Sequence, residues 1–535
     1  MTDGNSTLPD QNTSSTGQTE GSEVITRDEA DITLPELESH LFECADIIRN
    51  RVDKTDYKEY ILPLVFYKAF QDTYQDNYER VLNEKQEEGI DHQVAVKLAH
   101  DEAFHEYVVP KEYRWNDLLS ANNTALRVDD ALRKFEELND QFDGISTVEY
   151  SSVDAFTQQE DNRLEELLRH LDETNLSRYR VPPDMLGEAY MDLVKHFAEE
   201  EGRDGGEYFT PPEIVELMVK ILEPYEKDTS VHDPTCGSGG MLVQVAEHLQ
   251  KVQKVPEDHW RSIRFTGQEI NPTVYAMAQM NLAIHDVTGE IQKGDSLSNP
   301  QFTESDSELE HFDYILANFP FSARWDKDTL KDDSYGRFND LEKLPRADRG
   351  DYSFILHMAN QLKETGQAAI VVPHGVLFRK HESKFRDYLI ERDLIEAVVG
   401  LPENLFQNVS IPSAILVLNA EKPEHRSSEI QFINAADEEF YTELSNQNEL
   451  LDEGIDHITS IFKDWKTIER RARTVSHEEV AENDQNLNIA LYVDTTEPEE
   501  DINVEDELAK LRELQNERDE IESQMSQHME VLDYE

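Results

Sequence analysis

The chain has few cysteines and no long apolar run. Cys44 and Cys236 are its only cysteines among 535 residues, one in a helical stretch and one beside a glycine-rich turn. They offer neither a disulfide framework nor the ligands of a metal cluster. No apolar run approaches the ~20 residues of a membrane-spanning helix, and the N-terminus lacks the basic start and apolar stretch of a signal peptide. We therefore expect a cytoplasmic protein that holds no metal and crosses no membrane.

Positive charge is also scarce, with 50 Lys and Arg against 114 Asp and Glu, a formal net charge of -64. The acidic residues are spread along the whole chain, and a hydrophobic content of 38% is sufficient for folded domains. Such a surface repels DNA at ordinary ionic strength. In molar salt, however, the screening length falls to ~3 Å. The composition therefore suits either a protein adapted to concentrated salt, as in a halophile, or an acidic protein that avoids nucleic acid.

Residue patterns divide the chain into five regions. The predicted regions are a disordered acidic tail (1–30), a helical domain (31–176), an α/β domain (177–420), a mixed extension (421–500) and a heptad-like helix (501–535). In the helical domain, Leu37, Leu41, Ala45 and Ile48 recur at helical spacing, and Pro63 should kink or divide its helix. The last helix carries a heptad-like seam of Leu511, Leu514, Arg518, Ile521, Met525, His528 and Leu532. It either packs on its own protein as a solvated helix or, as this long seam favours, contacts a partner.

Strands and helices alternate in the α/β domain, which predicts a doubly wound, mainly parallel sheet. Predicted strands lie at 229–233, 264–268, around Ile291, at 314–316, 368–372, 397–400 and 414–418. The sheet pattern ends after about Asn419, and the polar segment 322–350 is expected to be a functional loop or insertion.

A glycine-rich turn joins the first predicted strand to the helix after it. This turn contains Asp233, Pro234, Gly237, Ser238, Gly239 and Gly240. Glycines at a helix N-terminus let a ligand approach the backbone, at the edge where doubly wound sheets bind ligands. The spacing fits neither the dinucleotide fingerprint nor a P-loop. Glu269 ends the second predicted strand, and Asp295 follows the third. Each alone could simply cap a turn, but together they favour a ribose-bearing cofactor.

A proline-containing segment precedes a helix that is predicted to begin near Glu213. The segment is Glu207, Tyr208, Phe209, Thr210, Pro211 and Pro212. As structure it predicts a helix start, with Thr210 as the cap and the prolines in the first turn. As function, its aromatic rings and backbone groups could hold the other end of a cofactor.

The tetrapeptide Asn318, Phe319, Pro320 and Phe321 follows the apolar strand that contains Ile315. An ordinary turn is one interpretation. The other is a site for a planar amine, because an Asn amide oxygen and the next backbone carbonyl can accept its hydrogens. An aromatic side chain can then stack on the attached ring.

These motifs resemble a known family. EYFTPPEIVELMV, DPTCGSGGML, QEIN, GDS and NFPF, in this order, are similar to the N6-adenine DNA methyltransferases. The similarity is closest to the modification (HsdM-type) subunit of type I restriction–modification systems and extends over most of the chain. It implies a Rossmann-like methyltransferase sheet at 177–420, flanked by an N-terminal helical domain and a C-terminal helix.

The resemblance also implies roles for the motif residues. The Glu207–Pro212 segment and the Asp233–Gly240 turn would hold S-adenosyl-L-methionine, with Glu269 on its ribose and Asp295 on its adenine. Asn318, the Phe319 carbonyl and Phe321 would hold the target adenine, flipped out of the duplex. The family usually has Asn-Pro-Pro, so Phe319 lacks the fixed φ of proline. The rigidity of this corner is therefore an open question.

The implied partners are double-stranded DNA, a specificity subunit, a second modification subunit and a restriction (nuclease/translocase) subunit. The chain has no basic stripe and no long segment suited to reading base edges after the sheet domain, which favours a borrowed specificity subunit. Three alternatives remain open: a stand-alone adenine methyltransferase, a protein-glutamine N5-methyltransferase and a non-catalytic scaffold.

Overall fold

The computed structural model forms two compact units, Met1–Val493 and Asp494–Glu535. It describes 30–494 apart from 50, 54–55, 106, 140–141, 158–161, 202–209, 253, 327–332, 342, 407–411, 438 and 445–446, and then 510–512, 514–516, 518–519 and 521–525. The predicted disordered tail, 1–30, lies almost wholly outside the described residues. No described helix is long and apolar enough to cross a membrane.

The N-terminal part is helical, since the first strand of the described residues begins only at Ser230. Its helices are α1 (Leu34–Ile48), α2 (Tyr57–Glu87), α3 (His92–Ala99), α4 (Trp115–Leu119), α5 (Thr124–Leu138), α6 (Asp154–Thr157), α7 (Arg163–Leu171) and α8 (Pro183–Glu201). Pro63 does not divide α2, which runs unbroken through it. Side chains of α8 such as Tyr190 and Phe197 are buried in the same core as α1 and α2. The packing thus continues past 176, and the domain boundary there stays a prediction.

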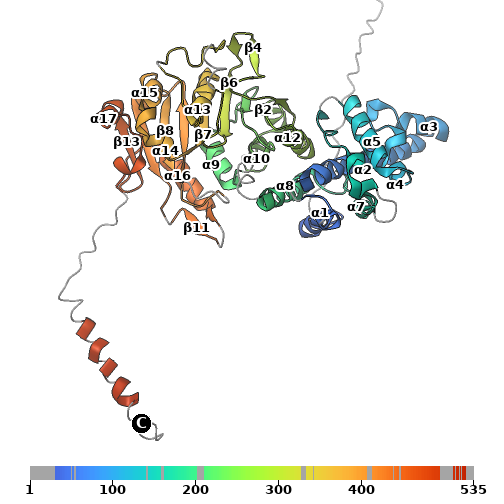
Figure 1. Ribbon diagram of the computed structural model, residues 1–535, viewed down its shortest axis with the longest axis horizontal. Helices are drawn as coiled ribbons and strands as arrows, with labels where there is room; N and C mark the ends of the chain where they lie inside the picture. Colours follow the sequence, from blue (N-terminus) through green and yellow to red (C-terminus); the bar gives the residue numbers. More distant parts are fainter. Residues whose placement is uncertain are drawn as a thin grey trace, which may run out of the picture. The chain divides into compact units, whose positions relative to one another are not determined.

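Nine strands form one sheet in the order β13-β10-β8-β9-β7-β6-β1-β2-β3 (Figure 1). They are β1 (Ser230–Asp233), β2 (Arg264–Glu269), β3 (Gly289–Lys293), β6 (Phe312–Asn318), β7 (Leu362–Pro373), β8 (Ile395–Gly400), β9 (Ser413–Asn419), β10 (Glu429–Asn434) and β13 (Ala472–Ser476). Strands β3, β2, β1, β6 and β7 are parallel neighbours, so their carboxyl ends share one edge. The predicted doubly wound fold is confirmed.

The prediction that the sheet ends after Asn419 is wrong. Strand β10 pairs parallel with β8, and β13 pairs antiparallel with β10. Both strands are short and separated by the helix α16 (Asp452–Asp464). Their pairing depends on partners far away in the sequence, which a local hydrophobic pattern does not reveal.

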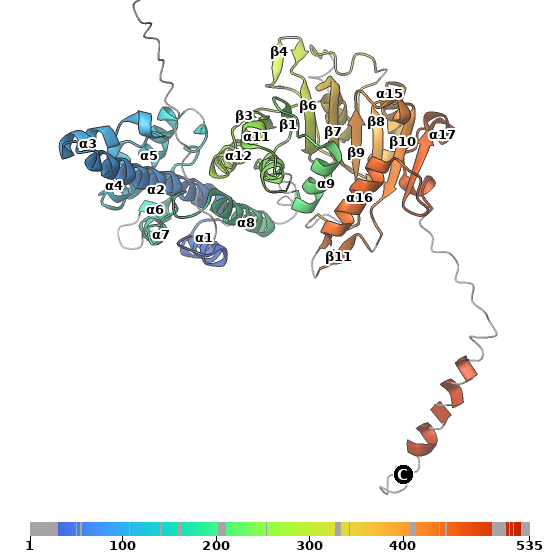
Figure 2. The same ribbon diagram turned by 180° about the vertical axis from the view of Figure 1, so that it is seen from behind.

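Helices cover both faces of the sheet (Figures 1 and 2). One face carries α9 (Pro212–Leu222), α10 (Gly240–Glu247), α12 (Pro272–Ile284) and α16. The other carries α13 (Asp351–Asn360), α14 (Gly375–Phe378), α15 (Ser383–Glu391) and α17 (His477–Glu482). Burial on both faces explains why the central strands are continuous apolar runs.

The C-terminal unit exposes the apolar side chains of its predicted seam. Leu511, Leu514, Ile521 and Met525 are each more than half exposed within this unit. The last two seam positions, His528 and Leu532, lie outside the described residues. Partner contact through this seam therefore remains a prediction.

Candidate functional site

The glycine-rich turn lies between β1 and α10. Asp233, the last residue of β1, is buried, and its Oδ1 accepts a hydrogen bond from the Thr235 backbone N at 2.9 Å. Gly237 and Gly239 have φ of +54° and +77°, a left-handed region that favours glycine. A Cβ at Gly239 would lie 2.8 Å from Leu282 Cδ1 of α12. The turn therefore needs glycine both for its conformation and for its close packing.

Glu269 ends β2 beside this turn. One carboxylate oxygen accepts from the Gly237 N at 3.2 Å and the other from the Asn271 N at 2.7 Å. Asn271 in turn caps α12 by accepting from the Thr273 N, as its sequence predicts. Burial raises the pKa of Glu269. Burial, with a smaller repulsion from Glu269, also raises the pKa of Asp233 to about 7. Two carboxyls are thus held close together in a poorly hydrated position.

Asp295 follows β3 at the same edge and is only partly buried. Its two carboxylate oxygens accept from the Leu297 N at 2.9 Å and the Ser298 hydroxyl at 2.7 Å. The Ser296 hydroxyl donates to the Pro234 carbonyl, which ties this loop to the glycine-rich turn. Asp295 therefore does cap a turn, and it also faces the cavity described below.

The Asn-Phe-Pro-Phe corner begins at Asn318, the last residue of β6. The Phe319 ring is 1% exposed and stacks on Phe354 of α13, with ring centroids 5.3 Å apart and planes at 13°. Phe321 meets Phe319 edge to face at 5.8 Å. A packed aromatic ring thus stands where the family usually has proline.

A hydrogen bond also fixes the backbone after the corner. Ser322 has a φ of +56°, and its N donates to Asp351 Oδ1 at 2.6 Å. Asp351 is fully buried, and its other oxygen forms an ion pair with Arg379 at 2.7 Å. This pairing holds a charged acceptor under the corner.

Thr210 contacts the corner instead of capping a helix. The N-cap of α9 is Pro211, without a side-chain cap bond, so the prediction of Thr210 as the cap is wrong. Asn318 Nδ2 instead donates to the Thr210 hydroxyl oxygen at 3.1 Å. Since an amide presents its oxygen opposite its nitrogen, this bond fixes the direction of Asn318 Oδ1. Glu207, Tyr208 and Phe209 lie outside the described residues.

The strand ends enclose a cavity of about 340 Å³. Six predicted residues line it: Pro234, Gly237, Glu269, Asp295, Asn318 and Pro320. A smaller cavity of about 20 Å³ adjoins Asn318 and is lined by Thr210, Asp233, Gly237, Ser238 and Gly240 among others. Asn318 and Gly237 line both cavities. Pro211, Pro212, Gly239, Phe319 and Phe321 line neither of the two.

Several lining residues were not predicted. Ile270, 63% exposed, Leu297 and Trp325 add apolar surface to the larger of these two cavities. Ile270 directly follows β2, and Leu297 follows Asp295 by two residues, so their places after strand ends could have indicated them. Trp325 lies in the polar segment after the corner, where periodicity gave no signal.

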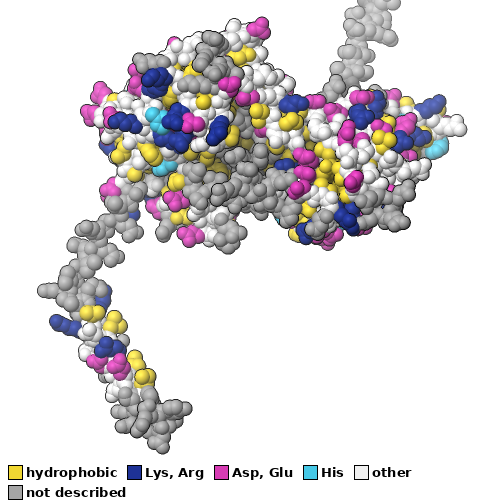
Figure 3. All heavy atoms as spheres, in the orientation of Figure 1, with side chains coloured by type: hydrophobic (Ala, Val, Ile, Leu, Met, Phe, Trp, Pro, Cys, Tyr) yellow, Lys and Arg dark blue, Asp and Glu magenta, His cyan; other side chains and the backbone are white. Residues whose placement is uncertain are grey.

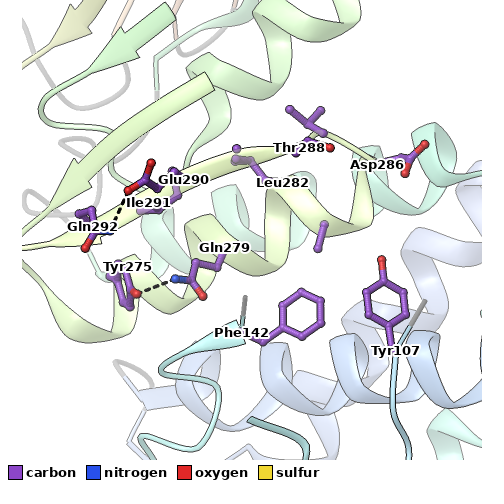
Figure 4. Close-up of a pocket in the computed structure, with 13 residues that line it drawn as sticks. Tyr107, Phe142, Tyr275, Gln279, Leu282, Asp286, Thr288, Glu290, Ile291 and Gln292 are labelled. Atoms are coloured by element: carbon purple, nitrogen blue, oxygen red, sulfur yellow. Dashed lines mark hydrogen bonds between the residues drawn. The ribbon is translucent and has the colours of Figure 1, made fainter. Parts of the chain in front are cut away.

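A cavity of about 430 Å³ lies elsewhere, between Tyr107 and Phe142 of the helical part and α12 and β3 (Figure 4). In it, Gln279 Nε2 donates to the Tyr275 hydroxyl at 2.6 Å. None of the predicted site residues lines this cavity. Volume alone therefore does not mark the site, whereas the converging strand ends at Asn318 do.

Sequence comparisons agree with this geometry. The family described as N-6 DNA Methylase matches residues 181–501, and the family described as HsdM N-terminal domain matches residues 37–171. The chain belongs to the N-6 DNA methylase family. The predicted class of enzyme, an adenine-specific DNA methyltransferase that depends on S-adenosylmethionine, is confirmed for this methylase.

Relatives that are named as type I restriction enzyme methylase subunits match this methylase over most of their length. The type I restriction enzyme MjaVII methylase subunit of Methanocaldococcus jannaschii is 34% identical, over 91% of this chain and 83% of the relative. The MpnII methylase subunit of Mycoplasma pneumoniae is 30% identical, over 88% and 91%. The crystal structure of a type I restriction–modification methyltransferase subunit from Streptococcus thermophilus has a TM-score of 0.71 at 28% identity and covers 86% of this chain and 100% of its own.

Proposed function

We propose that this chain is the modification subunit of a type I restriction–modification complex and methylates N6 of adenine in double-stranded DNA. The observation that carries this proposal is the meeting of Asn318 with Glu269 and the glycine-rich turn around one cavity. An amide acceptor for an amine thus lies beside groups suited to a ribose-bearing cofactor.

The residues of the cavity fit S-adenosyl-L-methionine. When bound, this cofactor supplies an activated methyl group. Glu269, buried with a raised pKa, can accept hydrogen bonds from ribose hydroxyls, and Asp295 faces the place for the adenine ring. The glycine-rich turn and the Glu207–Pro212 segment would hold the methionine part. A volume of about 340 Å³ suits a ligand of this size.

The corner residues would position and activate the target amine. Its lone pair is delocalised into the adenine ring and is a poor nucleophile. Asn318 Oδ1 and the Phe319 carbonyl would each accept one N6 hydrogen, drawing electron density onto the nitrogen. Phe321 would stack on the flipped base. Catalysis then depends on alignment, and Cys236, buried with a raised thiol pKa, takes no part.

Partners follow from the relatives, which are named as subunits. A specificity subunit would read the DNA sequence, and a second modification subunit and a restriction subunit would complete the assembly. A stand-alone methyltransferase would share every catalytic residue, so only activity without partners separates the two. The net charge of -64 suits a halophilic host.

An Asn318→Ala variant tests the catalytic role. We expect cofactor affinity to stay within about twofold and methylation to fall by about two orders of magnitude or more. Asn434→Ala is a matched control, because Asn434 also ends a strand of the sheet but only braces the turn at Ala436. Near-normal methylation by Asn318→Ala would refute the assignment. Calorimetry with the cofactor, and transfer of labelled methyl groups to unmethylated DNA by the chain purified with its host subunits, supply the two measurements.

A further inference from the structure

Two segments flank the Asn-Phe-Pro-Phe corner. Asn318 pairs with Val371 of the parallel neighbour β7, so residues 374–384 leave the sheet at the same edge. Residues 346–350 are hydrogen-bonded to the chain just after the corner: the Gly350 N donates to the Ala323 carbonyl at 2.8 Å. The Trp325 indole likewise donates to the Arg346 carbonyl at 2.8 Å. Both segments therefore lie beside the corner.

These segments carry a concentration of positive charge, here termed the basic patch. It comprises Lys343, Arg346, Arg349, Lys380 and Lys384. Arg379, in the same stretch, pairs instead with the buried carboxylates of Asp351 and Glu382. Lys384 Nζ donates to the Lys343 carbonyl at 3.0 Å, which joins the two segments. Figure 3 shows Lys and Arg side chains gathered over the part of this face that carries α14 and α15.

Few exposed carboxylates offset the basic patch among the residues that the structure describes. Two acids of the same stretches, Asp351 and Glu382, are only 0% and 4% exposed. Asp348 is exposed and pairs with Arg346. Arg349 and Lys380 form no ion pair with any carboxylate among the described residues. In a chain of net charge -64, these five cations, of which Arg346 is paired with Asp348, form a local site for an anion beside the corner.

We propose that the basic patch binds the phosphodiester backbone of duplex DNA next to the target adenine. This proposal rests on the proposed function, because a base that reaches Asn318 brings its flanking phosphates to the residues around the corner. Arginine and lysine contacts to phosphate are direct, charge-assisted hydrogen bonds. Salt screens the attraction between charges that lie further apart than the screening length. Direct contacts over a few ångströms therefore persist. The exposed ring of Phe378, 45% accessible, lies in the same segment and suits contact with a sugar.

The test compares two double variants of the full chain, purified with whatever subunits it retains from its own host. Arg349→Gln/Lys380→Gln removes two cations of the basic patch. Lys227→Gln/Lys466→Gln is the matched control, because both lysines are exposed and lie outside the patch. The probe is a fluorescent 30-base-pair duplex, whose binding is followed by anisotropy over a series of KCl concentrations. Cofactor affinity is measured in parallel.

We expect the patch variant to weaken duplex binding about tenfold. It should also reduce the slope of log affinity against log salt by about two, one unit for each phosphate contact. The KM for DNA should rise while kcat and cofactor affinity stay unchanged, and the control should match the parent. Unchanged affinity and slope overturn the proposal.

Loss of self-association in sedimentation, with normal duplex binding, also overturns the proposal, because the patch would then contact an acidic protein surface. If the parent methylates DNA and the patch variant matches it in duplex binding and methylation, the result refutes the role of the basic patch but leaves the proposed function standing. A parent that neither binds the duplex nor methylates adenine refutes the proposed function as well.

Discussion

At the scale of single residues, Thr210 decides which way the Asn318 amide faces. An amide bound through its nitrogen keeps its oxygen directed away from that partner, and Asn318 Nδ2 donates to the Thr210 hydroxyl. Without this bond the two ends of the amide could exchange by a rotation about χ2. The wrong end would present hydrogens to an amine that also carries hydrogens.

Thr210→Val keeps the shape of the side chain but removes the hydroxyl. Because a neutral hydrogen bond contributes about 1 kcal/mol, we expect kcat to fall about five- to tenfold with little change in melting temperature. Thr210→Ser keeps the acceptor and should restore most of the rate. Single-turnover methylation at saturating cofactor measures the effect. Equal rates for the Val and Ser variants would contradict the positioning role.

Asp233 provides a test of pH dependence. Burial raises its pKa to about 7, whereas an unfolded aspartate titrates near 4. Between these values the folded state holds a proton that the unfolded state has released, so this residue makes the protein less stable as pH rises. Above about pH 7 both states are ionised and the loss is complete.

Asp233→Asn removes this titration. Relative to the parent, we expect the cofactor-free variant to gain stability from about pH 4 to pH 7, by up to about 1.4 kcal/mol per pH unit, and then to level off. Denaturant unfolding at fixed salt measures the gap. Asp306→Asn, at an exposed carboxylate outside the site, is the control variant. A constant gap across the range would refute the titration of Asp233.

At the scale of elements, the corner after β6 depends on α13. Phe319 stacks on Phe354 at the start of that helix, and Asp351 in its first turn accepts from the Ser322 backbone. The family's usual proline would fix one backbone angle, whereas these contacts fix the corner from outside. We therefore predict that tertiary packing, instead of a fixed backbone angle, holds the corner in place.

Phe319→Pro therefore should not improve the protein, although it introduces the family's usual residue. It deletes a ring that is 1% exposed, and the cavity left behind should lower the free energy of unfolding by about 2–4 kcal/mol. Phe319→Leu fills part of this space and should lower the free energy of unfolding by about half as much. Urea unfolding in the same buffer ranks the three proteins. A proline variant as stable as the parent would show that the packed aromatic ring contributes nothing.

The sequence predicts the features that depend on neighbouring residues and misses those that depend on contacts distant in the chain. The seven strands from 229 to 418 were predicted from their own apolar runs, and Asn271 as a cap from its neighbours. β10 and β13 were missed because their pairing depends on β8. The sequence predicts Thr210 as a cap because it does not show that Asn318, 108 positions later, donates a hydrogen bond to the Thr210 hydroxyl. Motif order identified the site, and distant contacts explain how it is held.

At the scale of the whole molecule, charge and recognition must be reconciled. A net charge of -64 opposes DNA at ordinary ionic strength. Among the described residues, the basic patch places several cations close to the corner, and contacts to phosphate supply affinity without reading base edges. Sequence choice is therefore expected to come from another chain. The exposed apolar side chains of the C-terminal unit are the predicted contact for it.

The full chain purified alone should therefore bind the cofactor but methylate no defined DNA sequence. The reason is that phosphate contacts position a duplex, whereas base contacts select a site. Adding the subunit that co-purifies from the host should produce methylation at one sequence, which sequencing of modified adenines would map. A Leu514→Glu/Ile521→Glu variant, changed only in the exposed seam, should keep cofactor binding and lose the co-purifying subunit. Site-specific methylation by the isolated parent would instead establish a stand-alone methyltransferase.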